Sequence, residues 1–188
     1  GYIVARGKEA GMCKVHPIGS ITVGEEGKQL SEMGKMKEAG AVAVSDDGRP
    51  VSDARMMRLG IEYASDFGLL CLSHCEDKSL VDGGVVNEGY NSTLAGLKGI
   101  PRAAEEIMLA REIILAETLN KRVHICHVST KGGVQLLREA KARGVAVTAE
   151  TCPHYFSLTD DVIMSYDANT KVNPPLREAE DVAAIKEG

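Results

Sequence analysis

The chain contains no tryptophan, and aromatic residues make up only 4% of its 188 residues. Proteins that hold single-stranded nucleic acid stack its bases on aromatic rings, so such a platform is not expected here. Cationic runs are absent too: the 22 basic residues are scattered, and the formal net charge is −5. This composition argues against nucleic acid as a partner.

Long apolar runs are equally absent, and no segment approaches the roughly 20 apolar residues that cross a bilayer. We therefore expect no membrane association. The chain starts Gly1-Tyr2-Ile3 without an initiator methionine or a signal peptide, so we expect it to begin inside a longer protein. With 44% hydrophobic and 26% charged residues, it has the composition of a globular protein with a sizeable core.

The cysteines form no C-x-x-C pair, and three of the five lie in or beside apolar runs. An odd number in this setting favours reduced thiols and a cytoplasmic location. We expect these residues to be small buried hydrophobic groups rather than zinc ligands or redox groups. They are Cys13, Cys71, Cys75, Cys126 and Cys152.

Continuous apolar runs alternate with amphipathic segments along the chain. This pattern predicts a parallel sheet that is covered by helices. Strands are expected at 13–15, 41–45, 69–73, 122–126 and 145–149, and helices over 28–39, 54–67, 101–119, 131–143 and 178–186. The stretch 82–99 is rich in glycine and shows no periodicity. Since no linker interrupts the pattern, residues 1–188 are expected to be the central part of one domain.

Two α/β folds fit such a pattern, an open doubly wound sheet and a (β/α)8 barrel. No G-x-G-x-x-G follows any expected strand, so no dinucleotide site is indicated. No G-x-S-x-G elbow is present either, which excludes the usual serine nucleophile. Polar residues at several successive strand ends favour the barrel, of which about five central βα units would be present.

Asp47, His74 and His127 each come just after an apolar run that we expect to be a strand. His154 follows the next strand along the chain. In a barrel of this kind the carboxyl ends of the strands form one face, and that face carries the chemistry. Two imidazoles and a carboxylate are ligands that zinc prefers, so we expect a metal site there.

Each of these residues also has a simpler interpretation. Asp47 precedes Gly48 and is more typical of a turn when taken alone. His74 fits a ligand and a partly buried, hydrogen-bonded histidine equally well, and Glu76 fits an outer partner that orients a ligand or a solvated turn. Strand alternation places His124 on the face opposite His127, where it would point toward the helices.

His154 fits a ligand, a substrate contact or an outer partner. Asn173 precedes two prolines that hold the backbone extended, and an amide in a stiff loop suits a polar substrate. From spacing alone, a simple turn is favoured at Asn173.

Taken together, five segments resemble the class I, bacterial-type dihydroorotases of the amidohydrolase superfamily. The resemblance runs in order through most of the chain. Several of its motifs recur in hydantoinases and allantoinases, but hydantoinases place a carboxylated lysine where Asp47 stands. The segments are Ser45-Asp46-Asp47-Gly48, Leu72-Ser73-His74-Cys75-Glu76-Asp77, His127-Val128-Ser129-Thr130, Glu150-Thr151-Cys152-Pro153-His154 and Val172-Asn173-Pro174-Pro175-Leu176-Arg177.

The resemblance implies two zinc ions at the mouth of the barrel. Asp47 would bridge them, His74 and His127 would bind the second ion, and Asn173 would contact the substrate. The implied reaction is the reversible cyclisation of N-carbamoyl-L-aspartate to dihydroorotate. Zinc would lower the pKa of a bound water and polarise the amide carbonyl, and a carboxylate would move the proton to the leaving nitrogen.

Two parts of the family pattern are missing from these 188 residues. They are a His-x-His pair from the first barrel strand and a catalytic aspartate after the last. We therefore expect this polypeptide to be inactive alone. The alternatives are a hydantoinase or allantoinase, a non-catalytic dihydroorotase-like partner of aspartate transcarbamoylase, and a metal-free barrel with histidines at these places by chance. Homodimerisation is a further expectation for the complete protein.

Overall fold

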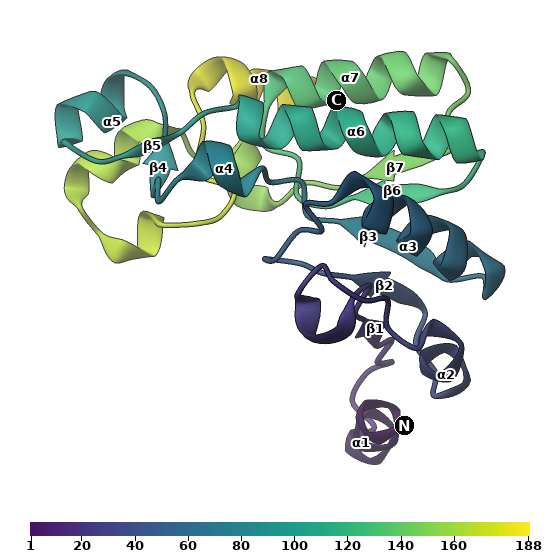
Figure 1. Cartoon of the computed structure of the whole chain (residues 1–188). Helices are drawn as coiled ribbons and strands as arrows, with labels where there is room; N and C mark the ends of the chain where they lie inside the picture. Colours follow the sequence, from purple (N-terminus) through teal and green to yellow (C-terminus); the bar gives the residue numbers. More distant parts are fainter.

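The computed structural model describes residues 1–188 and is built around a five-stranded sheet in which every neighbouring pair is parallel (Figure 1). The strand order is β1-β2-β3-β6-β7, so each new strand is added at the same edge. The strands are β1 (Ile18–Gly19), β2 (Ala43–Ser45), β3 (Leu70–Ser73), β6 (Val123–Ile125) and β7 (Val147–Ala149). The parallel sheet expected from the sequence is confirmed.

The strand register aligns the carboxyl ends along one edge of the sheet. Ser45 pairs with Leu72, and Ser73 pairs with Ile125. Ile125 also pairs with Ala149 of β7. The loops that follow β2, β3 and β6 therefore leave the sheet side by side, and they carry the three candidate ligands.

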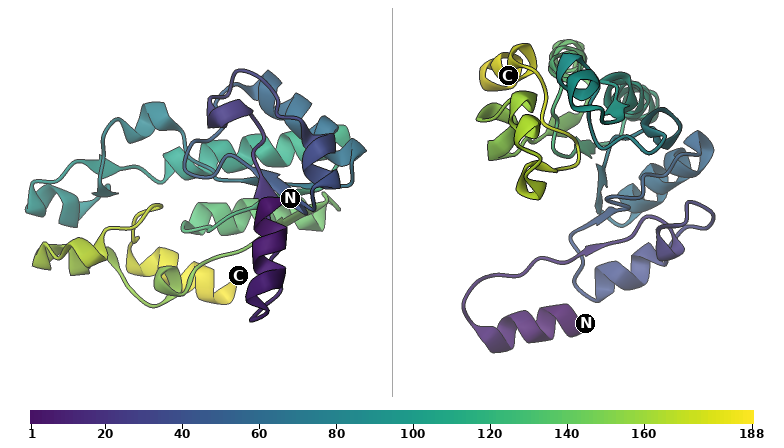
Figure 2. Two further views of the ribbon diagram at one scale, coloured as in Figure 1. Left: turned by 90° about the horizontal axis from the view of Figure 1, so that it is seen from below. Right: turned by 90° about the vertical axis from the view of Figure 1, so that its left-hand side faces the viewer.

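Three helices cover one face of the sheet, namely α3 (Ala54–Asp66), α6 (Ala103–Leu119) and α7 (Lys131–Ala142) (Figures 1 and 2). Strand residues that point toward them are buried in one core of 21 residues, which includes Cys71 and Ile125. This continuous apolar core between sheet and helices is the main stabilising feature of the chain. The opposite face of the sheet is more exposed.

The segment after β6 departs from simple alternation, and the predicted placement of His124 toward the helices is wrong. Ile125 is the residue that is buried under the helices, whereas His124 lies on the opposite face. There His124 Nδ1 is 2.8 Å from Thr148 Oγ1 on β7. His127 has a φ of 40°, which breaks the two-residue period between Ile125 and His127.

The helices α3, α6, α7 and α8 (Ala179–Glu187) occupy the expected segments to within two residues at each end. Asp53 caps α3, since its side chain accepts a hydrogen bond from Met56 N at 2.6 Å. No helix is long and apolar enough to span a membrane.

The first forty residues differ most from expectation. A helix, α1 (Tyr2–Ala10), precedes the first strand, and the strand lies at 18–19 rather than at 13–15. The predicted helix over 28–39 is only α2 (Met33–Glu38), because Leu30 forms an isolated antiparallel bridge with Thr22. An extended bridge and an α-helix cannot share the same backbone, so the helix begins after the bridge.

The glycine-rich stretch before α6 folds into a small unit of its own. It contains α4 (Lys78–Val81), α5 (Tyr90–Ala95) and a two-stranded parallel sheet of β4 (Val86–Asn87) and β5 (Gly99–Ile100). The 3-10 turn η3 (Asp160–Ser165) packs against α5 and β4. The other short turns are η1 (Val23–Glu25), which follows β1, and η2 (Pro153–Phe156) and η4 (Ala168–Thr170), which lie between β7 and α8. These elements are too short to produce a periodic sequence pattern.

Candidate metal centre

Asp47, His74 and His127 meet at the carboxyl edge of the sheet. His74 Nδ1 lies 2.8 Å from His127 Nε2 and 3.2 Å from Asp47 Oδ1. His127 Nε2 lies 3.5 Å from the same carboxylate oxygen. One ligand atom from each residue thus lies within 4.8 Å of the other two, which is the spacing of a group that could hold a metal ion. The two histidines are largely buried, with side chains 2% and 14% exposed, whereas Asp47 is 60% exposed.

The two adjacent aspartates after β2 have different environments. Asp46 is buried and accepts hydrogen bonds from the backbone N–H groups of Ile21 and Thr22 and from the Thr22 hydroxyl. It therefore anchors the loop after β1 to the end of β2. Asp47 points to solvent beside the histidines, and Gly48 with a φ of 79° turns the chain immediately after it.

His74 is oriented through the ring nitrogen that faces away from the other ligands. Its Nε2 lies 3.0 Å from Glu76 Oε2, and Glu76 also pairs with Lys78. Asn173 Nδ2 donates to the other oxygen of Glu76 at 3.3 Å. Because an ionised carboxylate only accepts, the contact with Glu76 favours the proton on His74 Nε2, and in that tautomer Nδ1 would offer its lone pair to a metal ion beside Asp47 and His127.

The ionisation of these groups follows from their surroundings. Burial opposes the charge on Glu76, but hydrogen bonds from His74 and Lys78 outweigh it and lower the pKa of Glu76 to about 2. Burial, and then the neighbouring His74, lower the pKa of His127 below its ordinary value. A carboxylate and an uncharged imidazole are the forms of these residues that favour metal coordination.

The arrangement of donors fits a zinc ion. Two imidazole nitrogens and one carboxylate oxygen are common zinc ligands, and catalytic sites combine three protein ligands with an open position. The hydrogen bond between Glu76 and His74 is the outer contact that metal-binding histidines usually make. On the open side of the sheet a hollow of about 420 Å³ lies next to Asp47 and is lined by Leu72, Cys126 and Glu150, among others.

The other two sequence candidates, His154 and Asn173, make no direct contact with Asp47, His74 or His127. His154 stacks edge-on against Tyr155, with ring centroids 4.1 Å apart, and belongs to no group of potential metal ligands. Asn173 reaches the site only through Glu76. Of the five cysteines, all are free, and Cys71, Cys75 and Cys126 are buried as expected. Cys13 is exposed and Cys152 half-buried, so the expected burial is wrong for Cys13.

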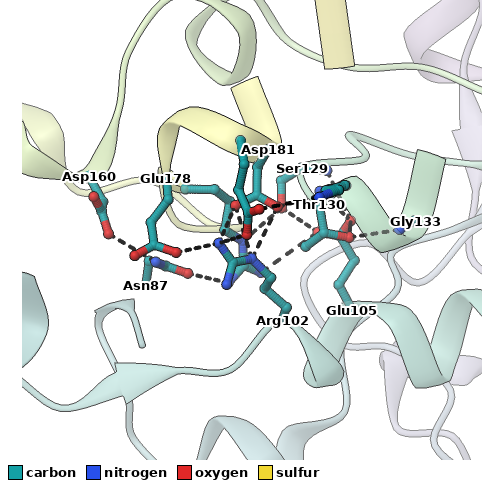
Figure 3. Close-up of polar contacts among 12 residues, drawn as sticks. Asn87, Arg102, Glu105, Ser129, Thr130, Gly133, Asp160, Glu178 and Asp181 are labelled. Carbon is teal, nitrogen blue, oxygen red and sulfur yellow. Dashed lines mark hydrogen bonds and ion pairs between the residues drawn. The ribbon is translucent and has the colours of Figure 1, made fainter. Parts of the chain in front are cut away.

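A buried polar network behind the metal edge was not anticipated from the sequence (Figure 3). Glu105, which is 3% exposed, accepts hydrogen bonds from Ser129 and Thr130 just after His127. Arg177 donates to Ser129 Oγ at 3.1 Å and to Asn87 Oδ1 at 3.0 Å. Asn87 in turn donates to Asp160 at 2.9 Å. The network joins the metal edge to the small β4–β5 sheet.

A second part of this network fastens α8 to the rest of the molecule. Arg102 donates to both oxygens of Asp181, from Nε to Oδ1 at 3.0 Å and from Nη2 to Oδ2 at 2.6 Å, and also to Glu178 (Figure 3). Asp181 is fully buried and also accepts from the backbone N–H of Lys131 at 2.9 Å. The only sign of these contacts in the sequence is that a charged residue, Asp181, lies on the buried face of α8.

The comparisons with known proteins agree with this geometry. A family model described as "Dihydro-orotase-like" matches residues 1–133. The dihydroorotase of Pelobacter propionicus is 59% identical over 187 residues, which is 100% of this chain and 44% of that protein. The dihydroorotase of Pelotomaculum thermopropionicum is 62% identical over 178 residues, which is 95% of this chain and 42% of that protein. The chain thus spans less than half the length of these curated relatives.

Among solved structures, an L-hydantoinase (dihydropyrimidinase) from Arthrobacter aurescens aligns with a TM-score of 0.76 and 22% identity. The alignment covers 96% of this chain and 42% of that structure. A D-hydantoinase aligns with a TM-score of 0.70 and 24% identity over 89% of this chain. These likenesses show the fold, which is part of the TIM barrel of the amidohydrolases. The family model, which matches more than half of the chain, shows that the chain belongs to the dihydro-orotase-like family.

Proposed function

We propose that this chain is the central part of a zinc-dependent dihydroorotase, a cyclic amide hydrolase that interconverts N-carbamoyl-L-aspartate and dihydroorotate in pyrimidine biosynthesis. The main support is that Asp47, His74 and His127, which follow three different strands, place potential zinc-binding atoms within 4.8 Å of one another. All of this chain matches part of a dihydroorotase, with 59% identity over 187 residues. The domain is proposed to be a single barrel, of which residues 1–188 supply the central units.

Asp47, His74 and His127 would hold the metal. Bound zinc would supply a water that is acidic near neutral pH and a Lewis acid for the amide carbonyl. Glu76 keeps His74 in the tautomer that presents Nδ1, and the lowered pKa of His127 keeps its ring uncharged. Asp47, as the exposed carboxylate of the three, is the residue suited to bridge a second ion.

Asn173 is proposed to contact the substrate. Its side chain lies beside Glu76, in a loop that is held on one side by the hydrogen bond from Tyr155 to the Pro174 carbonyl at 2.7 Å. A polar ring with amide groups would be recognised by such an amide donor and acceptor. His154, which packs against Tyr155, is proposed as an outer residue of the site.

The remaining parts of the proposed site, a His-x-His pair and a catalytic aspartate, would come from other segments of the complete protein. We expect this polypeptide alone to show no turnover. The complete protein is proposed to act on a small substrate in the cytoplasm, since all five cysteines are free, and to form a homodimer or to associate with aspartate transcarbamoylase.

The deciding experiment compares dihydroorotate, hydantoin and allantoin as substrates of the complete protein, with its zinc content measured in parallel. We expect turnover of dihydroorotate above the other two, because Asp47 stands where the resemblance places lysine in hydantoinases. Preferred hydrolysis of hydantoin or allantoin would identify a related cyclic amidase. Absence of zinc and of turnover, with binding to aspartate transcarbamoylase, would instead establish the non-catalytic partner.

A further inference from the structure

Helix α6 carries two glutamates whose side chains are almost fully buried. Glu105 is 3% exposed and Glu112 is 0% exposed. They are seven residues apart, which is close to two turns, so both lie on the helix face that packs against the rest of the molecule. Burying a carboxylate is costly unless it receives hydrogen bonds, and an apolar residue would fill the same space more cheaply. The contacts of each glutamate show what it does there.

Glu112 supports the strand end that bears His74. Ser73 Oγ donates to Glu112 Oε1 at 3.0 Å, and Ser73 is the last residue of β3, directly before His74. Arg111 Nη2 donates to the same Glu112 oxygen at 2.5 Å. The second oxygen of Glu112 has no partner. All of the hydrogen bonds to Glu112 therefore use a single acceptor atom.

Glu105 supports the segment that follows His127 (Figure 3). Its Oε1 accepts from the backbone N–H of Ser129 at 2.9 Å, from the backbone N–H of Thr130 at 3.1 Å and from the Thr130 hydroxyl at 3.1 Å. Its Oε2 accepts from the Ser129 hydroxyl. Both oxygens are thus surrounded by donors.

Helix capping alone does not account for Glu105. The first turn of α7 already has its cap, because Thr130 Oγ1 accepts from Gly133 N at 3.0 Å. The groups that Glu105 holds lie two and three residues after His127, and they fix the exit of a backbone that has just passed through a φ of 40° at His127. A left-handed conformation at a non-glycine residue persists only where its surroundings hold it.

We propose that Glu105 and Glu112 are positioning residues, and that α6 sets the relative placement of the two histidines by holding both of their segments from behind. This inference rests on the proposed function, since it takes the histidines as metal ligands. Glu105 acts on His127 through Ser129 and Thr130, and Glu112 acts on His74 through Ser73. Neither glutamate touches the metal or the substrate.

The test uses the variants E105Q and E112Q in the complete protein, with E117Q as the matched control on the same helix. Glu117 is exposed and forms a surface ion pair with Arg143. A glutamine at 112 keeps an acceptor for Ser73 and Arg111, so E112Q should retain zinc affinity, whereas E112A should lose it. A glutamine at 105 turns an NH2 group toward donors, so E105Q should weaken zinc binding by about tenfold, the lower end for outer partners of a ligand.

Zinc affinity is measured by competition with a chelator, and the geometry of the site by the visible spectrum of the cobalt-loaded protein. Amide hydrogen exchange of residues 126–131 in the metal-free protein adds a readout that needs neither metal nor substrate. We expect faster exchange there in E105Q and an altered cobalt spectrum. A merely structural role would lower the unfolding midpoint without moving the spectrum.

The inference is overturned if E105Q folds and retains the zinc affinity and exchange rates of the parent protein, or if E117Q changes them equally. Should E105Q fail to fold, S129A removes the Ser129 hydroxyl contact of Glu105, together with the hydrogen bond from Arg177 to that hydroxyl. S129A is expected to raise exchange at 126–131, and an unchanged rate would overturn the inference. If the parent protein binds no zinc, the proposed function fails, and the exchange data alone then decide whether Glu105 holds this segment.

Discussion

The segments that carry His74 and His127 reach the same edge of the sheet, but they are held in different ways. His74 is fixed through its ring, which is hydrogen-bonded at Nε2 to Glu76. His127 has no such ring contact on its far side, and its segment is fixed through the backbone by Glu105. A ligand can therefore be positioned either at the side chain or at the main chain, and the two designs should fail differently.

The largest expected effect comes from removing a ligand from either segment. In the complete protein, H74A and H127A should each lower zinc content and reduce turnover by more than about 100-fold, beyond the effect typical of outer partners. Metal analysis and steady-state kinetics measure both. H124A is the matched control, because His124 lies on β6, just before His127, and is not one of the three proposed ligands. Full zinc content in H74A would remove the basis for comparing the two segments.

The ring-fixed segment is tested by E76A. Without Glu76 the His74 ring loses the acceptor that sets its tautomer, so zinc affinity should fall by about 10–100-fold. Amide exchange at 126–131 should stay unchanged, because the His127 segment is held from α6. E62A serves as the control, since Glu62 makes only a surface pair with Arg58. Faster exchange around His127 in E76A would show that the two segments are not independently held.

The backbone-fixed segment is tested by T130V. This change removes the cap of α7 and one hydrogen bond to Glu105, so the free energy of unfolding should fall by about 1–2 kcal/mol. Urea unfolding of the metal-free complete protein measures it. T118V, at an exposed position of α6, should leave the free energy of unfolding unchanged. Equal loss in both variants would contradict a special role for Thr130.

The smallest effect is expected from K78M, which removes the exposed partner of Glu76. The pKa of Glu76 is lowered to about 2 against burial by hydrogen bonds from His74 and Lys78. A lowered pKa in the folded state adds stability above the ordinary pKa of glutamate, and that stability is lost as the pH falls toward 2. K78M should therefore lose less stability than the parent protein between about pH 4.5 and pH 2. Acid unfolding with a chelator present would reveal it, and identical acid profiles would contradict it.

Much of the sheet, and the proximity of Asp47, His74 and His127, was predictable from the sequence. Continuous apolar runs mark buried parallel strands, and strands in register bring the residues after them to one edge. The predicted face of His124 was wrong because a two-residue alternation cannot indicate the φ of 40° at His127. The helix predicted over 28–39 was too long because Leu30 forms a backbone bridge with Thr22, a contact that local periodicity does not indicate.

The supporting network was not predictable for a related reason. Glu105 and Ser129 are 24 residues apart, and Arg177 and Asn87 are 90 apart. No local pattern encodes such pairs. The one available sign was the pair of acidic residues on the buried face of α6, which periodicity alone assigns to a solvated surface.

The left-handed backbone at His127 limits which residues evolution or a designer can place there. Asparagine, aspartate and histidine tolerate that conformation better than other residues, and branched side chains tolerate it least. Only histidine among these offers an imidazole nitrogen. Position 127 is thus restricted twice, once by the donor that a metal needs and once by the shape of the chain. In a saturation library, asparagine would be expected among the folded but inactive survivors, while valine and isoleucine would be lost at the folding step.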